Sequence, residues 1–161
     1  MTATQEKVTL VVFSGELDRA IAAFNIAIGA ASMGMEVSMF FTFWGLNVLK
    51  RNEGEIKSKG LLKKMLNLVN RGGTTRLPLS RFQMMGLGSW MMKRLMKDEN
   101  FPQIEELISE ARELGVKFVA CTTSMGIMGL GKDAFIPEVD SYAGVATYLA
   151  DAREGSVNLF V

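Results

Sequence analysis

The residues best suited to chemistry lie in one short segment, 119–131, which reads VACTTSMGIMGLG. It holds Cys121, the only cysteine of a chain that has twelve methionines and no histidine. The run Thr122–Ser124 follows it and can cap a short helix that begins near Met125. Unpaired N–H groups at a helix start stabilise a thiolate, which is the nucleophilic form of cysteine. Unpaired cysteine is also often a small buried apolar side chain, so both a reactive and an inert Cys121 stay open.

The same composition excludes several classes of site. Without histidine, a Ser-His-Asp triad, a Cys-His pair and a histidine zinc site cannot form. The glycines of the segment are spaced G-x-x-G-x-G, which matches neither the dinucleotide fingerprint nor the phosphate loop. In the first loop, SGELD, Glu16 and Asp18 stand where a phosphate would prefer cations. We therefore expect no metal and no cofactor.

Length and composition favour one soluble domain. The chain has 161 residues, of which 48% are hydrophobic and 22% charged. The first residues lack a basic stretch followed by an apolar one, and a lone cysteine forms no internal disulfide, so we expect a cytoplasmic protein. The uncharged stretches 20–35 and 37–49 are shorter than the roughly 20 apolar residues that a membrane-spanning helix needs.

Strand and helix patterns alternate along the chain. Strands are predicted at 8–13, 36–43, 116–123, 134–139 and 157–161, and helices at 17–33, 100–115 and 140–155, with two more within 56–97. The starts of the last three helices are assigned to Ser80, Asn100 and Asp140. This alternation predicts a single α/β domain, 1–161, with a parallel sheet and helices on both faces.

The middle of the chain, about 50–99, interrupts this alternation as a helical insertion. Its core, 56–97, carries ten basic residues and no acidic one, and six of the methionines. Three alternatives stay open: a solvated lid, a docking face for an acidic protein, or helices that contact an anionic membrane surface. We expect a partner to contact Lys63, Lys64, Lys93 and Arg94. Nucleic acid is not expected, because the rest of the chain is acidic.

Ligands of a parallel sheet collect where its strands end. Cys121 ends one predicted strand, and Phe43 and Trp44 end another, where they could line an apolar pocket near the cysteine or could be ordinary core aromatics. The predicted substrate contacts are Gly15, Phe43, Trp44, Ser124, Met125 and Gly126, with N–H groups of 124–126 facing the bound group.

Three features together carry a resemblance to a known family. These are LVVFSGELDRAIAAFNIAIGAASMGMEVSMFFTFWGLNVL, the basic, methionine-rich middle, and FVACTTSMGIMGL. The chain resembles the DsrE/DsrF-like sulfur-relay superfamily, in its DsrE-type subgroup with a long middle insertion. The resemblance implies a flavodoxin-like fold of about five parallel strands, for which the common order is 2-1-3-4-5, and a homo-oligomer. It also implies that Cys121 carries sulfur as a persulfide or thiosulfonate.

We therefore predict a sulfurtransferase or sulfur carrier whose partners are sulfur-carrier or rhodanese-type proteins. Exchange at sulfur requires one thiolate and neither metal nor histidine. Some relatives have a further cysteine, which this chain lacks. The alternatives are a non-catalytic binding module in which Cys121 is inert, and a small-ligand sensor that uses the aromatic pocket.

Overall fold

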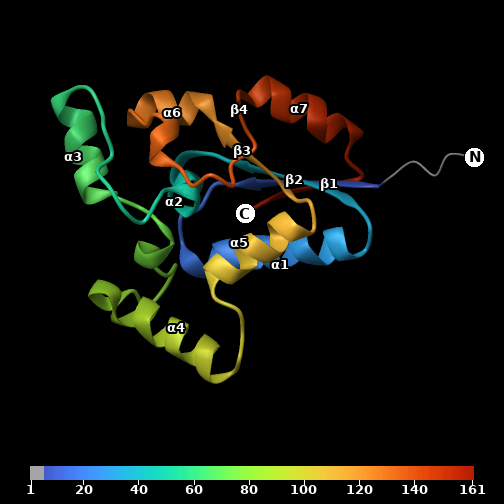
Figure 1. Cartoon of the computed structure of the whole chain (residues 1–161), viewed down its shortest axis with the longest axis horizontal. Coiled ribbons are helices and arrows are strands. Elements are labelled where there is room, and N and C mark those ends of the chain that lie inside the picture. The colour runs from blue at the N-terminus through green and yellow to red at the C-terminus, as the bar shows by residue number, and fades with distance from the viewer. Residues whose placement is uncertain (1–5) are drawn as a thin grey trace, which may run out of the picture.

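A five-stranded parallel sheet forms the centre of the computed structural model, which describes residues 6–161 (Figure 1). The strands are β1 Lys7–Val12, β2 Glu36–Phe41, β3 Lys117–Cys121, β4 Ser141–Ala143 and β5 Val157–Phe160. The helices are α1 Leu17–Ser32, α2 Leu46–Leu49, α3 Leu61–Val69, α4 Leu87–Asp98, α5 Ile104–Glu113, α6 Thr122–Met128 and α7 Val145–Glu154. The predicted α/β fold, with helices on both faces of a parallel sheet, is confirmed.

The strand order is β4-β3-β2-β1-β5, so the order 2-1-3-4-5 is wrong for this chain. In that order β1 would lie between β2 and β3, whereas here β3 pairs directly with β2. The last strand then fills the free edge of β1, where the N–H of Val161 donates to the carbonyl oxygen of Val11.

One face of the sheet packs on α1 and α5 and forms the main core. Alternate residues of each strand point to this face, because side chains of a strand alternate between its two sides. The aromatic centre is Phe24 of α1, whose ring lies 6.2 Å from Phe41 and 5.6 Å from Phe118. Helix α5 begins with a capping box between Gln103 and Glu106, so the start assigned to Asn100 is wrong.

The opposite face is covered less completely, by α6 and α7 (Figure 1). A small second cluster lies there, formed by Val11, Phe40 and Cys121 with Tyr148 of α7 packed against it. The rings of Phe40 and Tyr148 stack at 5.1 Å. Every residue of α7 is at least partly exposed, so this helix contributes little burial.

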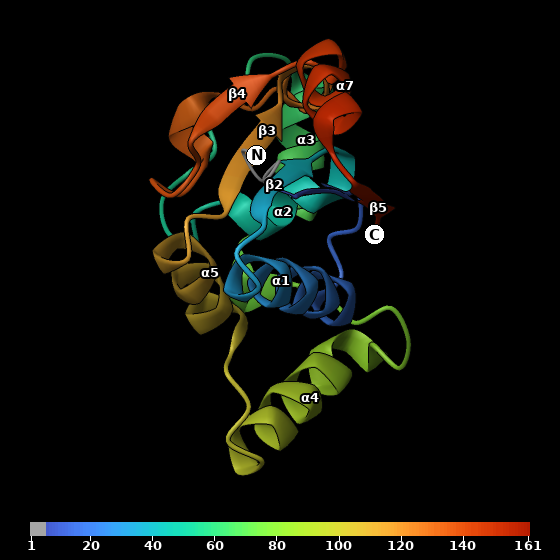
Figure 2. The same cartoon turned by 90° about the vertical axis from the view of Figure 1, so that its right-hand side faces the viewer.

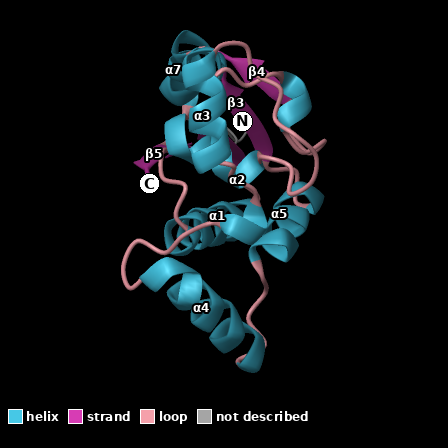
Figure 3. Ribbon diagram, turned by 90° about the vertical axis from the view of Figure 1, so that its left-hand side faces the viewer, coloured by secondary structure: helices cyan, strands magenta, loops and turns pink. Residues whose placement is uncertain are grey.

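The two helices of the insertion lie on opposite sides of the molecule (Figures 2 and 3). Helix α3 packs beside α6, and α4 lies beyond α1. Large apolar side chains of both segments are solvent-exposed: Leu62 is 81% exposed on α3 and Phe82 is 82% exposed before α4. The start assigned to Ser80 is wrong, because its N–H and hydroxyl bind the carboxylate of Asp18, and α4 begins seven residues later.

The segment 134–155 differs from the prediction. No strand forms at 134–139 beyond an isolated antiparallel bridge between Lys50 and Phe135. Asp140 does not cap a helix, because its carboxylate binds Arg112 and the N–H of Phe118. Strand β4 therefore follows it beside β3, and α7 begins only after Gly144. Within residues 6–161, every helix is too short or too polar to cross a membrane.

Candidate functional site

Cys121 stands where β3 ends and α6 begins. The helix starts at Thr122, three residues earlier than expected, so Cys121 occupies its cap position directly. Side chains of a strand alternate between its two faces. Ala120 points to the main core, so the side chain of Cys121 points to the opposite face and belongs to the small cluster under α7. The thiol thus lies at the carboxyl edge of the sheet, where ligands of parallel sheets bind.

The surroundings of the thiol favour its charged form. Burial raises the pKa of Cys121, but hydrogen bonds lower it by more, so that the pKa lies below the ordinary value of 9.0. The donors are the N–H and hydroxyl of Ser124, the hydroxyl of Thr42 and the N–H of Thr123. Hydrogen bonds to a charged group stabilise that form selectively. The site can therefore supply a thiolate more readily than a free cysteine can.

Thr42 was missed by the sequence analysis. It follows β2, which pairs with β3 in parallel, so Thr42 and Cys121 lie at the same edge of the sheet. Its hydroxyl lies 2.8 Å from the hydroxyl of Ser124. The rule that neighbouring parallel strands end together could have identified this residue, because FFTF places a hydroxyl directly after the strand.

Access to the thiol is restricted. Cys121 is 5% exposed and lies against Val11 and Phe40, with Tyr148 packed over the cluster. Movement of this cover would expose the sulfur to a reagent. Because α7 has no buried residue, its displacement costs less than opening the main core would.

Ser124 is the one predicted substrate contact that the structure brings to the thiol. Met125 is buried in the main core cluster and lies away from the cluster that contains Cys121. The carbonyl oxygen of Gly126 accepts a hydrogen bond of 2.9 Å from Lys63 of α3. That the N–H groups of Met125 and Gly126 contact a group on Cys121 stays a prediction.

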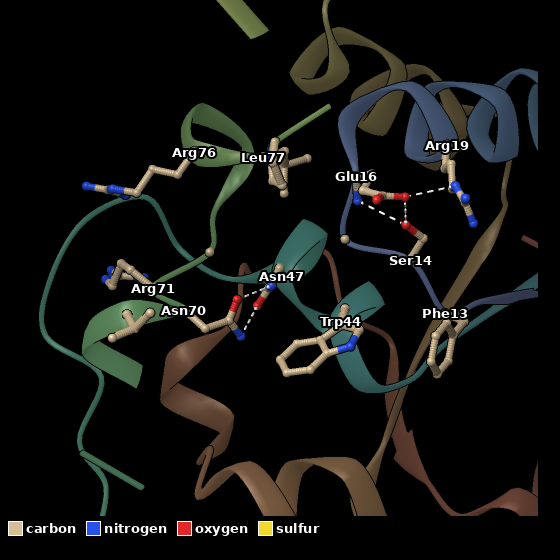
Figure 4. A pocket seen from close by; sticks show the side chains of 14 residues that line it. Phe13, Ser14, Glu16, Arg19, Trp44, Asn47, Asn70, Arg71, Arg76 and Leu77 are labelled. Carbon is tan, nitrogen blue, oxygen red and sulfur yellow. Dashed lines mark hydrogen bonds and ion pairs between the residues drawn. The ribbon is translucent and has the colours of Figure 1, made fainter. Parts of the chain in front are cut away.

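Gly15 and Trp44 line a separate cavity of about 580 Å³, whose walls do not include Cys121 (Figure 4). Phe43 is 40% exposed and its ring lies 5.7 Å from that of Phe13. The cavity that Trp44 lines therefore includes neither Cys121 nor Phe43. The cavity lies at the end of β1, because Trp44 turns toward the loop that follows β1.

The four predicted partner-binding cations differ in how free they are. Lys63 is bound to Gly126 as above, Lys93 donates to the carbonyl oxygens of Thr74 and Thr75, and Arg94 pairs with Asp98 on its own helix. Lys64 is exposed. Of the four, Lys64 is thus the side chain most available to a partner. The described residues, 6–161, contain no group of three or more acidic or cysteine side chains placed to hold a metal ion.

A family model for the DsrE/DsrF/DrsH-like family matches residues 4–160. The chain belongs to this family. The family predicted from the sequence is therefore confirmed.

Two relatives match this chain over all or nearly all of its length. A Bacillus subtilis (strain 168) protein named Uncharacterized protein YrkE is 45% identical over 161 residues, which is 100% of both chains. The Sulfur carrier protein DsrE2 of Allochromatium vinosum is 33% identical over 158 residues, which is 98% of this chain and 99% of the relative.

Two solved structures resemble this DsrE-like chain in fold. The ychN protein from E. coli aligns with a TM-score of 0.60 at 9% identity, over 98% of this chain and 100% of its own. Protein MTH1491 from Methanobacterium thermoautotrophicum aligns with a TM-score of 0.56 at 13% identity, over the same shares. At these identities the likeness concerns the fold alone.

Proposed function

We propose that this protein acts in a sulfur relay by accepting sulfane sulfur on Cys121 and passing it to a partner protein. The family and the 33% identical relative named as a sulfur carrier support a role in sulfur relay. The observation that carries the role of Cys121 is its set of hydrogen-bond donors, which lower the pKa of the thiol at the edge of the sheet. A cytoplasmic location stays a prediction.

The transfer is a balanced exchange at sulfur. The Cys121 thiolate attacks the outer sulfur of a polysulfide or persulfide donor, a new S–S bond forms, and the donor's own S–S bond breaks. The rest of the donor leaves with the electron pair of that bond, as a thiolate from a persulfide or as a shortened polysulfide anion. An acceptor thiolate then attacks the outer sulfur of the Cys121 persulfide and releases the Cys121 thiolate. The hydrogen-bonding groups of Ser124 and Thr42 assist both steps. They stabilise the Cys121 thiolate when it is the nucleophile in the first step and the leaving group in the second.

Intact mass spectrometry tests the carrier role. Wild-type protein exposed to polysulfide is expected to gain about 32 Da for each sulfur atom bound, and the gain should disappear on treatment with a thiol reductant. Cys121→Ser should gain nothing. Thr42→Val, which keeps the cysteine but removes one donor, should load more slowly. A wild-type protein that gains no sulfur under these conditions contradicts the proposal.

Loading requires α7 to move, because Tyr148 packs over the cluster that holds the thiol. Tyr148→Ala is expected to accelerate loading by polysulfide, and Thr147→Ala, an exposed truncation on the same helix, should not. An unchanged rate for Tyr148→Ala would show that sulfur enters by another route. The helix is thus proposed as the cover of the site.

We place the partner on the basic, apolar surface of α3. This helix lies beside α6, which begins at the cysteine, and it is tied to α6 by the Asn67 amide, which donates to the carbonyl oxygen of Met128 at 2.9 Å. Leu62 and Leu68 are 81% and 82% exposed next to Lys64. A surface of this kind fits a partner with an acidic rim and an apolar centre.

Charge reversal tests this placement. Lys64→Glu should reduce sulfur transfer to an acidic acceptor and its salt dependence, while Lys97→Glu makes the same charge change on the remote helix α4 and serves as the control. Equal effects of the two variants would contradict docking on α3. The alternative function, a non-catalytic module that binds an acidic partner or a membrane surface, is supported by the same exposed apolar residues. This alternative predicts that Cys121→Ser binds the acidic partner as well as the wild type does. It also predicts that anionic liposomes retain both the wild type and Cys121→Ser.

A homo-oligomer is proposed from the exposed apolar residues of α7 and β5. Val145, Leu149 and Phe160 are 58%, 55% and 70% exposed. Light scattering after gel filtration should give more than one copy per particle, and Leu149→Lys should lower that number. A monomeric wild-type protein contradicts this proposal.

A further inference from the structure

The cavity lined by Gly15 and Trp44 lies between the loop after β1, the turn after β2 and the segment 69–78 of the insertion (Figure 4). Its volume of about 580 Å³ lies within the range of small-molecule sites, roughly 300–1,000 Å³. Trp44, which is 43% exposed, and Leu77 are apolar residues of its lining. The side-chain amide of Asn47 donates a hydrogen bond through Nδ2 to Oδ1 of Asn70, at 2.7 Å. The cavity thus combines an aromatic surface with paired polar groups.

The charges around this cavity do not balance. Its one carboxylate, on Glu16, pairs with Arg19 at 2.8 Å and accepts a hydrogen bond from Ser14. The other two cations, Arg71 and Arg76, form no ion pair among residues 6–161. The lining therefore carries two positive charges without a counterion.

Backbone carbonyls hold these two guanidinium groups in place. Arg71 donates to the carbonyl oxygens of Arg51, Glu53 and Gly54, at 2.8, 3.1 and 2.7 Å, and Arg76 donates to that of Asn52 at 2.9 Å. Carbonyls fix the position of a guanidinium but do not neutralise it. A guanidinium has five N–H donors, so two remain on Arg71 and four on Arg76 for an outside acceptor.

A third cation lies directly behind the wall. Lys50 has no exposed surface, and its Nζ donates to the carbonyl oxygen of Asn70 at 2.9 Å. Its stem lies so close to Gly72 that a Cβ there would be 2.7 Å from Cδ. Burial, and then the charge of Arg71, lower the pKa of Lys50 to about 8. Near neutral pH this buried side chain still carries most of its charge beside Arg71, a cation of the same sign.

We propose that this cavity binds a small organic anion, whose carboxylate, sulfonate or phosphate oxygens accept hydrogen bonds from the N–H groups that Arg71 and Arg76 do not use on 51–54, and whose apolar part extends into the cavity toward Trp44. Arginine pairs with such oxyanions in a fixed, often bidentate geometry. The site is separate from Cys121 and does not depend on the sulfur-relay proposal.

Tryptophan fluorescence tests this site directly. The chain has two tryptophans, so Trp90→Phe leaves Trp44 as the single reporter. In this variant benzenesulfonate should change the Trp44 emission saturably. Benzyl alcohol, a neutral molecule of similar size, should bind at least about tenfold more weakly, because it lacks the charge that the guanidinium groups bind. Parallel titrations with benzoate, phenyl phosphate and inorganic sulfate show which oxyanion is preferred and whether the ring is required.

Matched variants in the same background distinguish the proposed contacts from general charge. Arg76→Gln and Arg71→Gln should each weaken benzenesulfonate binding about tenfold or more. Arg81→Gln removes an exposed charge of the same insertion outside the cavity, and it should leave binding unchanged. Because Arg71 also binds the carbonyls of the segment 51–54, circular dichroism must show that its variant is folded. If it is not, Arg76→Gln decides.

Three results would overturn the proposal: no saturable change with any anion up to about 10 mM, equal binding of benzyl alcohol, or equal weakening by Arg81→Gln. Cys121→Ser should bind benzenesulfonate like the parent. The fate of this site is therefore independent of whether Cys121 carries sulfur.

Discussion

Replacing Lys50 by methionine is expected to stabilise the protein at neutral pH. Lys50 is completely buried, and its single hydrogen bond is to the carbonyl oxygen of Asn70. Its pKa of about 8, against the ordinary 10.5, shows that the folded protein disfavours its charge. At 1.36 kcal/mol per pH unit, this difference corresponds to about 3 kcal/mol of stability lost when the side chain is charged. Methionine fills a similar volume without a charge.

The net gain is smaller, because the substitution also removes the hydrogen bond to Asn70, which contributes about 1 kcal/mol. We expect Lys50→Met to raise the free energy of unfolding by about 2 kcal/mol at pH 7. Above pH 8 the unfolded chain binds more protons than the folded one, so the stability of the wild type rises until about pH 10.5. The advantage of the variant should therefore shrink over this interval and vanish near pH 10.

Urea denaturation at pH 7 and pH 10 measures this effect. Lys97→Met, which changes an exposed lysine of α4, is the control and should change stability by less than about 0.5 kcal/mol at either pH. A Lys50→Met protein that is less stable than wild type at pH 7, or whose difference does not depend on pH, would refute the reasoning. The same variant should weaken benzenesulfonate binding, because it removes a charge behind the cavity.

Three further predictions concern the fold and the thiol. Gly45→Ala should destabilise the protein by at least about 2 kcal/mol in urea denaturation, because its Cβ would overlap the last carbonyl oxygen of β1. Gly29→Ala, which has free space on α1, should stabilise the protein by up to about 1 kcal/mol. Similar effects of the two variants would contradict the close packing at Gly45. The rate at which iodoacetamide alkylates Cys121 should have a pH midpoint below that of the urea-unfolded chain, and Ser124→Ala should raise this midpoint. Equal midpoints in the folded and unfolded protein would show that the fold does not stabilise the thiolate. Asp140→Asn should cost about 1–3 kcal/mol because it loses a charge that accepts three hydrogen bonds, and a loss below about 0.5 kcal/mol would show that solvent replaces them.

The sequence predicted the elements of this fold better than their arrangement. Strand β1 is rich in apolar residues and is buried at all six positions, as expected for a central parallel strand, although it also buries Lys7 and Thr9. Periodicity says nothing about which strands pair, so the position of β3 beside β2 could not be read from it. Asp140 shows the limit of local signals: an acidic residue before an apolar helix is a typical cap, yet here its carboxylate serves a neighbouring strand.

The candidate site was predicted in part, for the same reason. Cys121 and Ser124 are close in sequence, so the strand-to-helix junction identified both. Thr42 reaches them from 82 positions before Ser124, and only the pairing of β2 with β3 brings it there. The closeness of the two cations Lys50 and Arg71 has no local signal in the sequence, because only contacts across the insertion bring them near each other.

The turn after β2 joins the thiol site to the cavity. Thr42, at its start, faces Ser124, and Trp44, two residues on, lines the cavity. Gly45 fixes the turn, because its N–H donates to the carbonyl oxygen of Phe13 at 2.7 Å and no side chain would fit in its place. Residues that break local rules at a stability cost are expected where function requires them. The buried Lys50 and the covered thiol of Cys121, whose pKa is lowered, are two such groups.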